Sequence, residues 1–337
     1  MLEKEFKELI VNVKNDILNT QYKIIENANL ELINLYFRLG KIISENVKYG
    51  NNFIENISRY LKIEFPNMSG FSKRNLSRMK YFYEEYKDFE ILPTSLAKLP
   101  WSHNYLLIER IKDKKVRAWY AEKCYQNGWS YSMLDHQIDL QLYKRQVLSN
   151  KLTNFENNLP ISQSELAKDL LKDPYIFELE NLKEHAIEKD VERAMTERIK
   201  NVLLELGRGF SFIGSQYKIS TVKDDYYIDL LFYHLELRCY IVVELKTVQF
   251  RPEYIGQLSF YVTAIDETLK KEGDNPTIGL LLCKNKDKLS VEWSLKSSNS
   301  PIGVSSYQIQ NNIPKSILDK LPTEKDINMY INDCSKL

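Results

Sequence analysis

YYIDLLFYHLELRCYIVVELKT, residues 226–247, consists of two runs rich in Val, Ile, Tyr, Phe and Leu, which is the composition of β-strands. A turn near residues 235–237 joins the runs, so we expect them to pair as an antiparallel hairpin. If the turn centres between the last two of these residues, Asp229 lies opposite Glu244. Side chains alternate along a strand, so Lys246 shares the face of Glu244. The hairpin therefore gathers two carboxylates and an ammonium group in an apolar setting.

Two interpretations of these three side chains are open. Buried acids are costly unless they are paired, hydrogen-bonded or metal-bound. Asp229 and Glu244 would offer Mg²⁺ the hard oxygen ligands it prefers, with the cation of Lys246 beside them. Alternatively, the three groups lie on the wet face of a hairpin, where Lys246 neutralises the two acids. The hairpin alone does not decide between the two.

The composition is that of a folded protein with a sizeable core. The chain has 337 residues, 43% hydrophobic and 28% charged, which suggests two domains. No apolar run is long enough to span a membrane, and the acidic, interrupted N-terminus does not resemble a signal peptide. The four cysteines are widely spaced, which argues against a disulfide framework or a zinc site and favours a cytoplasmic location.

The first part of the chain is expected to be all α-helical. Apolar residues repeat at helical spacing over 1–48 and 53–64, and a further helix is expected after Gly70, capped by Ser72. A short helix, a glycine-containing turn and a helix with a basic face form a helix-turn-helix-like pattern. That face is expected to contact DNA, and its candidate residues are Lys73, Arg74, Arg78 and Lys80. The alternative is a solvated basic face with no ligand.

The second part of the chain alternates between helices and strands. Polar residues within 149–183 predict a linker and connecting segment. A helix is expected over 186–206, followed by a strand, the hairpin and a helix over 253–270. Further strands are expected at residues 210–220, 277–284, 291–295 and 303–309. The pattern predicts an α/β domain in which helices flank one mixed sheet.

The order of these elements resembles the core of PD-(D/E)xK nucleases. The motif is present as Ile228-Asp229 on one strand and Glu244-Leu245-Lys246 on the next. The following helix carries Gln257 and Tyr261, which lie four residues apart and therefore share one helical face. This pair resembles the QxxxY motif of the RecB-like branch, whose residues line the same site.

Longer stretches are similar to the YhcG-like family of bacterial PD-(D/E)xK nuclease domain proteins. They include GFSFIGSQYKI, FRPEYIGQL and DNPTIGLLLCK in the second part, and GFSKRNLSRMKYFYEEY in the first. The resemblance covers roughly residues 5–318 and implies a restriction-endonuclease-like α/β/α fold after an all-α domain of DNA-binding character. We accordingly expect four regions: residues 1–148 for the helical domain, 149–183 for the linker, 184–320 for the nuclease domain and 321–337 for a C-terminal tail.

The resemblance also implies roles for individual residues. Asp229, Glu244 and the carbonyl of Leu245 would hold Mg²⁺, or Mn²⁺ in its place. Lys246 would orient water or stabilise negative charge in the transition state. Gln257 would position a metal-bound water or the scissile strand, and Tyr261 would support Gln257 or contact phosphate. Glu205, at the end of the preceding helix, resembles an acid that related nucleases bring to the site, although it also fits an exposed helix end.

These implications predict a metal-dependent nuclease that cleaves DNA in repair, recombination or restriction. DNA is the expected partner, together with a second copy of the chain and subunits of a restriction or repair complex. The alternative is a DNA-binding or assembly module without catalysis, whose nuclease-like domain is a dimerisation scaffold. Retention of Asp229, Glu244, Lys246, Gln257 and Tyr261 together favours the nuclease.

Overall fold

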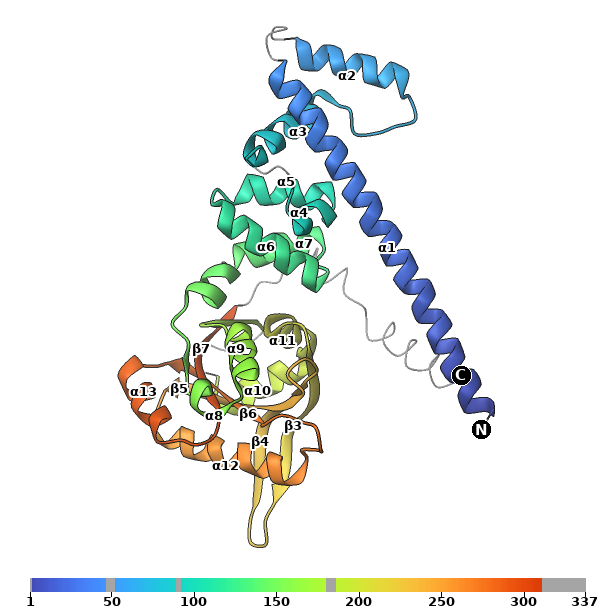
Figure 1. The fold of residues 1–337 in the computed structure, drawn as a ribbon. Coiled ribbons are helices and arrows are strands. Elements are labelled where there is room, and N and C mark those ends of the chain that lie inside the picture. The colour runs from blue at the N-terminus through green and yellow to red at the C-terminus, as the bar shows by residue number, and fades with distance from the viewer. Residues whose placement is uncertain (1, 47–51, 89–91, 180–185, 311–337) are drawn as a thin grey trace. The chain divides into compact units, whose positions relative to one another are not determined.

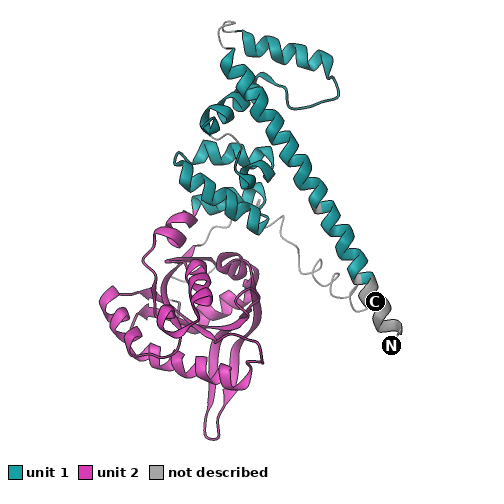
Figure 2. Cartoon of the chain, in the orientation of Figure 1, with its two compact units in different colours: residues 1–139, 320–337 teal, residues 140–319 magenta. Residues whose placement is uncertain are grey.

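The computed structural model describes residues 2–46, 52–88, 92–179 and 186–310. The described residues divide into two compact units, one within residues 1–139 and the other within residues 140–319 (Figure 2). The predicted C-terminal tail, residues 321–337, lies outside the described residues. Among the residues that are described, no helix combines the length and the apolar character needed to cross a membrane.

The first unit is helical throughout its described part, as the sequence predicts (Figure 1). Its helices are α1 (Leu2–Glu45), α2 (Phe53–Glu64), α3 (Lys73–Tyr86), α4 (Thr94–Lys98), α5 (Trp101–Arg110), α6 (Lys114–Asn127) and α7 (Tyr131–Asp139). Ser72 caps α3 by accepting a hydrogen bond from the backbone N–H of Asn75, which satisfies a donor that the helix leaves free. Helix α1 crosses α3 so closely that a Cβ on Gly40 would lie 2.1 Å from the carbonyl oxygen of Met79.

The second unit is built on a mixed sheet. Its strands are β1 (Leu152–Thr153), β2 (Tyr175–Glu178), β3 (Phe210–Ser220), β4 (Asp225–His234), β5 (Cys239–Gln249), β6 (Ile278–Asn285) and β7 (Ile302–Gln310). The strand order is β1-β7-β6-β5-β4-β3, and β2 also pairs with β7. Strands β3, β4 and β5 are antiparallel, whereas β5, β6 and β7 are parallel.

Two apolar cores lie on the two faces of this sheet. The helical elements are η2 (Lys144–Leu148), α8 (Phe155–Asn158), α9 (Ile161–Leu170), α10 (Glu188–Glu197), α11 (Ile199–Leu206), α12 (Glu253–Thr268) and α13 (Lys288–Lys296). One core joins sheet residues such as Val243 to α9, α10 and α11, and the other joins alternate residues such as Val242 to α12 and α13 (Figure 1). Consecutive strand residues face opposite sides, so this is the predicted α/β/α arrangement.

Three expectations for the second unit need correction. Residues 149–183 are not a plain linker, because they supply β1, α8, α9 and β2, and the strands among them pair with β7. The helix expected over 186–206 is divided at Arg198 into α10 and α11. The strand expected over 291–295 belongs to helix α13. Asp287 caps that helix by accepting from the N–H of Ser290, and the helix buries Val291 and Leu295, which are four residues apart.

Candidate active site

The β4–β5 hairpin positions the two predicted carboxylates as its register requires. The antiparallel pairing runs from His234 opposite Cys239 to Leu230 opposite Val243. Asp229 precedes Leu230 on β4 and Glu244 follows Val243 on β5, so the two carboxylates lie at the next step of the same register. The Oδ2 atom of Asp229 accepts a hydrogen bond of 2.8 Å from the backbone N–H of Leu245, which ties β4 to β5 at this point.

Lys246 completes the group that the sequence pattern predicts. Its Nζ atom lies 2.9 Å from Oε1 of Glu244 and 3.1 Å from Oε2 of Glu188. The ammonium group also lies 5.3 Å from the centre of the Tyr254 ring, within the range of a cation–π interaction. Lys246 is largely buried, so solvent screens these contacts only weakly.

Helix α12 adds the two residues of the QxxxY pattern. The side-chain amide of Gln257 donates to Oε1 of Glu244 at 2.8 Å and to the hydroxyl of Tyr261 at 3.1 Å. Gln257 and Tyr261 lie one helical turn apart, so both reach the same end of β5. The structure thus places both α12 residues in one hydrogen-bonded group with Glu244 and Lys246.

Glu244 is the most perturbed acid of this group. It is only 2% exposed, and burial, followed by the charge of Asp229, raises its pKa to about 7. Burial also raises the pKa of Asp229. For Lys246 burial acts to lower the pKa, but the adjacent Glu244 and Glu188 outweigh it and raise the pKa. Paired carboxylates of this kind are a site for an additional positive charge.

The atoms of Glu244 fit a divalent cation. Its Oε1 accepts from Lys246 and Gln257, whereas its Oε2 is buried and has no hydrogen-bond partner. A buried carboxylate oxygen without a partner is costly unless a cation or water satisfies it. The described residues do not contain three or more His, Cys, Asp or Glu residues grouped as a metal cluster. The fit therefore rests on Asp229, Glu244 and a backbone oxygen, which are hard donors suited to Mg²⁺.

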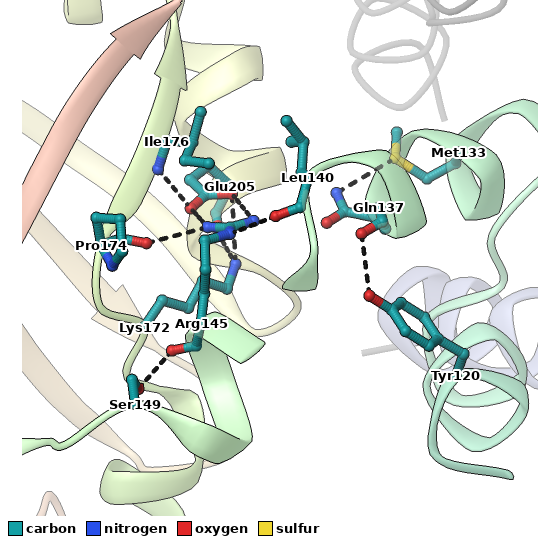
Figure 3. Close-up of polar contacts among 10 residues, drawn as sticks. All are labelled: Tyr120, Met133, Gln137, Leu140, Arg145, Ser149, Lys172, Pro174, Ile176 and Glu205. Atoms are coloured by element: carbon teal, nitrogen blue, oxygen red, sulfur yellow. Dashed lines mark hydrogen bonds and ion pairs between the residues drawn. The ribbon is translucent and has the colours of Figure 1, made fainter. Parts of the chain in front are cut away.

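Glu205 makes its polar contacts with Arg145, Lys172 and Ile176 (Figure 3). Its Oε1 lies 2.5 Å from a guanidinium nitrogen of Arg145 and accepts from the N–H of Ile176 at 2.8 Å. Lys172 lies 3.7 Å from its other oxygen and also donates to its backbone carbonyl. None of its described contacts is with Asp229. These contacts favour a structural role for Glu205 over the sequence-based assignment to the site.

Two acids of α10 lie at the site instead, and sequence reasoning missed both. Glu188 pairs with Lys246, and Glu192 is buried beside Asp229, whose charge, after burial itself, raises the pKa of Glu192. Gln216 holds Glu192 through a hydrogen bond of 2.7 Å. The two acids are four residues apart and therefore share one face of the helix. Helix α10 contains further acids, so the sequence alone did not indicate which of them face the site.

The predicted DNA-binding residues occupy α3 but differ in availability. Lys73 pairs with Glu55 at 2.9 Å on the surface, and Arg74 is exposed. Two residues of the set are half-buried. Arg78 stacks 3.7 Å from the centre of the Tyr105 ring, and Lys80 lies 3.6 Å from an acid one turn further along α3. The connection between α2 and α3, residues 65–72, is longer than the turn of a usual helix-turn-helix.

A mixed sheet between helices, with Asp229 on one strand, Glu244 and Lys246 on the next and Gln257 on the following helix, defines the PD-(D/E)xK nuclease class. Comparison with known protein families agrees with this assignment to the PD-(D/E)xK nuclease class. Residues 168–322 match the family described as the YhcG PDDEXK nuclease domain, and residues 12–145 match the DUF1016 N-terminal domain. These two matches, one for each part of the chain, agree with the resemblance to the YhcG-like family that the sequence indicates.

A curated relative spans both domains. The protein of Escherichia coli (strain K12) named "Putative nuclease YhcG" is 27% identical in an alignment that covers 88% of this chain and 88% of the relative. Among solved structures, the chain is similar to one titled "Structure of EndoMS-dsDNA2 complex", with 17% identity and a TM-score of 0.27. It is also similar to a repair endonuclease from Pyrococcus abyssi, with 13% identity and a TM-score of 0.25. These similarities cover 40% and 39% of this chain, and 50% and 49% of the solved chains.

Proposed function

We propose that this chain is a divalent-metal-dependent nuclease that hydrolyses phosphodiester bonds of DNA. The observation that carries the proposal is the environment of Glu244. One of its oxygens is fixed by Lys246 and Gln257, its other oxygen is buried without a partner, and the carboxylate of Asp229 is adjacent. A purely structural ion pair has no need of a second acid or of an unsatisfied oxygen.

Asp229, Glu244 and the carbonyl of Leu245 are the proposed metal ligands, with Mg²⁺ as the expected ion and Mn²⁺ able to replace it. When bound, such an ion supplies Lewis acidity at a phosphate oxygen and lowers the pKa of a coordinated water. Burial of Glu244 favours this, because a low-dielectric setting strengthens the attraction between its carboxylate and a cation. Glu192, next to Asp229, is proposed to hold a water molecule that contacts the metal ligands.

The remaining side chains are proposed to act on the substrate. Lys246 would place its ammonium group beside the scissile phosphate and stabilise the charge that develops there. Its contact with Glu188 keeps the long side chain in one orientation, which limits the entropy lost on binding. Gln257 fixes the orientation of Glu244 through one hydrogen bond of its amide, and the hydroxyl of Tyr261 accepts a second hydrogen bond from the same amide.

A panel of substrates tests this proposal. Purified protein is incubated with Mg²⁺ or Mn²⁺ and single-stranded, duplex or branched DNA, beside Asp229→Ala and Lys246→Ala. Metal-dependent cleavage by the natural protein alone is expected on at least one substrate. If neither ion gives cleavage above the variants on any substrate, autonomous nuclease activity is ruled out.

The competing proposal is a DNA-binding or assembly module without catalysis. A thermal-shift titration separates it from the nuclease even when the right DNA is not at hand. Mg²⁺ is expected to raise the melting temperature of the natural protein but not that of Asp229→Ala, because ligand binding to the folded state stabilises it. Asp224→Asn, which changes an exposed acid in the turn between β3 and β4, is the matched control and should respond as the natural protein does.

The first unit is proposed to bind DNA through α3. Lys73 and Arg74 are the most accessible cations of the four predicted residues, so Lys73→Ala/Arg74→Ala should weaken DNA binding. The slope of the logarithm of the binding constant against the logarithm of the salt concentration, called the salt slope, should become shallower by about two. Arg78→Ala should change the slope less, because its guanidinium is stacked on Tyr105. A salt slope that does not change in the double variant would exclude α3 as the phosphate contact.

The setting of this activity also remains a proposal. A homodimer is expected, since cutting both strands commonly takes two active sites, and so is a role in DNA repair, recombination or restriction alongside further subunits. A reducing, cytoplasmic location is expected from the cysteines. Cys124, Cys239 and Cys283 are free and buried, which fits a compartment in which thiols stay reduced.

A further inference from the structure

Helix α1 carries an apolar stripe that nothing in the described part of the chain covers. Ile10, Val13, Ile17 and Ile24 are 42%, 47%, 53% and 62% exposed. Isolated exposed apolar residues are common on protein surfaces, but several large branched side chains along one side of a helix are typical of an interaction site. We call these four residues the α1 stripe.

The stripe lies on the opposite side of α1 from the face that packs on the first unit. Ile33, Tyr36 and Ile43 are buried in that unit, and Gly40 meets the backbone of α3. At about 100° per residue, Ile24 is roughly 180° around the helix from Ile33. The helices that hold the C-terminal half of α1 therefore do not cover the stripe.

The spacing of the stripe is that of a coiled coil. Ile10, Val13, Ile17 and Ile24 occupy alternate a and d positions of a heptad repeat, and Thr20 fills the remaining d position. The flanking e and g positions are polar and carry both charges, as Lys14, Asp16, Gln21 and Lys23. A narrow apolar seam with polar residues on both sides is typical of a helix that packs against another helix.

The repeat also has a defined end. Continuing the heptad along α1, the next a and d positions are all polar: Asn27, Glu31, Asn34, Arg38 and Lys41. The apolar seam therefore stops at Ile24, close to where the opposite face of α1 begins to pack on its own unit. A seam of this extent is about 20 Å long, at 1.5 Å per residue.

We propose that the α1 stripe pairs with the same stripe of a second copy of this chain to form a two-stranded coiled coil. The seam is self-complementary, because a twofold axis places the apolar a and d side chains of one copy against those of the other. The charged residues that flank the seam are compatible with the pairing of two copies. When the two helices run antiparallel, Asp16 of one copy can approach Lys23 of the other, and the two contacts related by the twofold axis are both attractive.

This inference deepens the expected homodimer by naming its surface, and it does not depend on the nuclease chemistry. The test measures the molar mass of the full-length protein by light scattering or sedimentation, without DNA or metal. The seam variant is Ile17→Asp/Ile24→Asp. The matched control is Ile25→Asp/Ile42→Asp, which alters two similarly exposed isoleucines of the same helix outside the a and d positions.

The natural protein and the control are expected to be dimers, and the seam variant a monomer with unchanged circular dichroism. Four lost isoleucine contacts per dimer should raise the dissociation constant by about a thousand-fold or more. Ile17→Ala/Ile24→Ala, which preserves helix propensity, should show the same direction with a smaller change.

Two results would overturn the inference. A natural protein that is monomeric at micromolar concentration excludes both the seam and the homodimer, while leaving single-strand cleavage open. A dimer that persists in the aspartate and alanine seam variants excludes this surface but not the homodimer. Neither result bears on the metal site, so failure here is distinguishable from failure of the proposed nuclease.

Discussion

Replacing Arg145 with methionine tests whether the ion cluster around Glu205 is structural. Arg145 is 5% exposed, and Glu205 is 4% exposed. The guanidinium donates to Glu205, to the carbonyl of Leu140 at 2.9 Å and to that of Pro174 at 3.2 Å (Figure 3). Methionine has a similar length but no charge, so the substitution leaves the buried carboxylate with one fewer cation and two carbonyls without a donor.

The expected cost follows from this geometry. Removing one partner of a buried ion pair costs about 3–5 kcal/mol, because the remaining charge stays buried. Lys172, 3.7 Å from the same carboxylate, and the N–H of Ile176 remain, so we expect the lower part of that range. For a unit of this size about 1 kcal/mol shifts the melting temperature by about 2–4 °C, which gives a fall of about 6–12 °C.

Calorimetry of the full chain provides the assay, with Arg145→Met, Glu205→Gln and the double variant forming a cycle. The transition that shifts should be the one belonging to the second unit, and the cycle should give a coupling of about 1–3 kcal/mol. Glu205→Gln should retain metal-dependent cleavage at temperatures where it is folded. If Glu205→Gln abolishes cleavage without lowering the melting temperature, Glu205 is a site residue and the structural role is wrong.

Further predictions concern packing and pH. Gly40→Ala should destabilise the first unit by about 1–3 kcal/mol in denaturant unfolding, because the added Cβ would overlap the carbonyl of Met79. Gly256→Ala on α12, where no atom lies near the added Cβ, should instead stabilise the second unit by up to about 1 kcal/mol. Equal effects of the two substitutions would contradict the close crossing of α1 and α3. Burial lowers the pKa of His234, so this side chain binds its proton more readily in the unfolded chain, and its contribution to stability should fall as the pH drops from about 7 to 5. The stability difference between the natural protein and His234→Gln isolates this contribution and should change across that range; a difference that is constant with pH would show that His234 contributes no pH dependence.

The sequence was sufficient for features that depend on local periodicity. Alternation along the hairpin and the position of its turn predicted the register that brings Asp229 beside Glu244 and Lys246. The four-residue spacing of Gln257 and Tyr261 predicted that both face one site, and their hydrogen bond agrees. Period-2 and helical patterns are encoded within a few residues, so they can be recognised without knowing the partner elements.

Features that depend on distant partners were missed. Strand β1 has two residues and β2 has four, and both exist because they pair with β7, more than a hundred residues later. The position of Glu205 follows from the same packing, since α11 lies against β2, whose Ile176 N–H binds its carboxylate. The break at Arg198 separates α11 from α10, which faces the site. No glycine or proline lies at this position, so the sequence did not predict the break.

The segment around residues 291–295 shows a different limit. Val291, Trp293 and Leu295 alternate as in a strand, yet Val291 and Leu295 also fit one face of a helix. Burial of those two residues and the cap at Asp287 decide for the helix, and Trp293 remains 64% exposed. Short apolar patterns with two compatible periods are settled by packing rather than by propensity.

The most direct test of the proposed metal site is the rate of Mg²⁺-dependent DNA cleavage by Glu244→Gln. This change preserves the shape of the side chain and its acceptor for Lys246 and Gln257, but it removes the charge next to Asp229. We predict that the cleavage rate falls by at least about a thousand-fold while the protein stays folded, and that Asp224→Asn cleaves at the natural rate. Cleavage by Glu244→Gln within about tenfold of the natural rate would contradict a metal site built on Asp229 and Glu244.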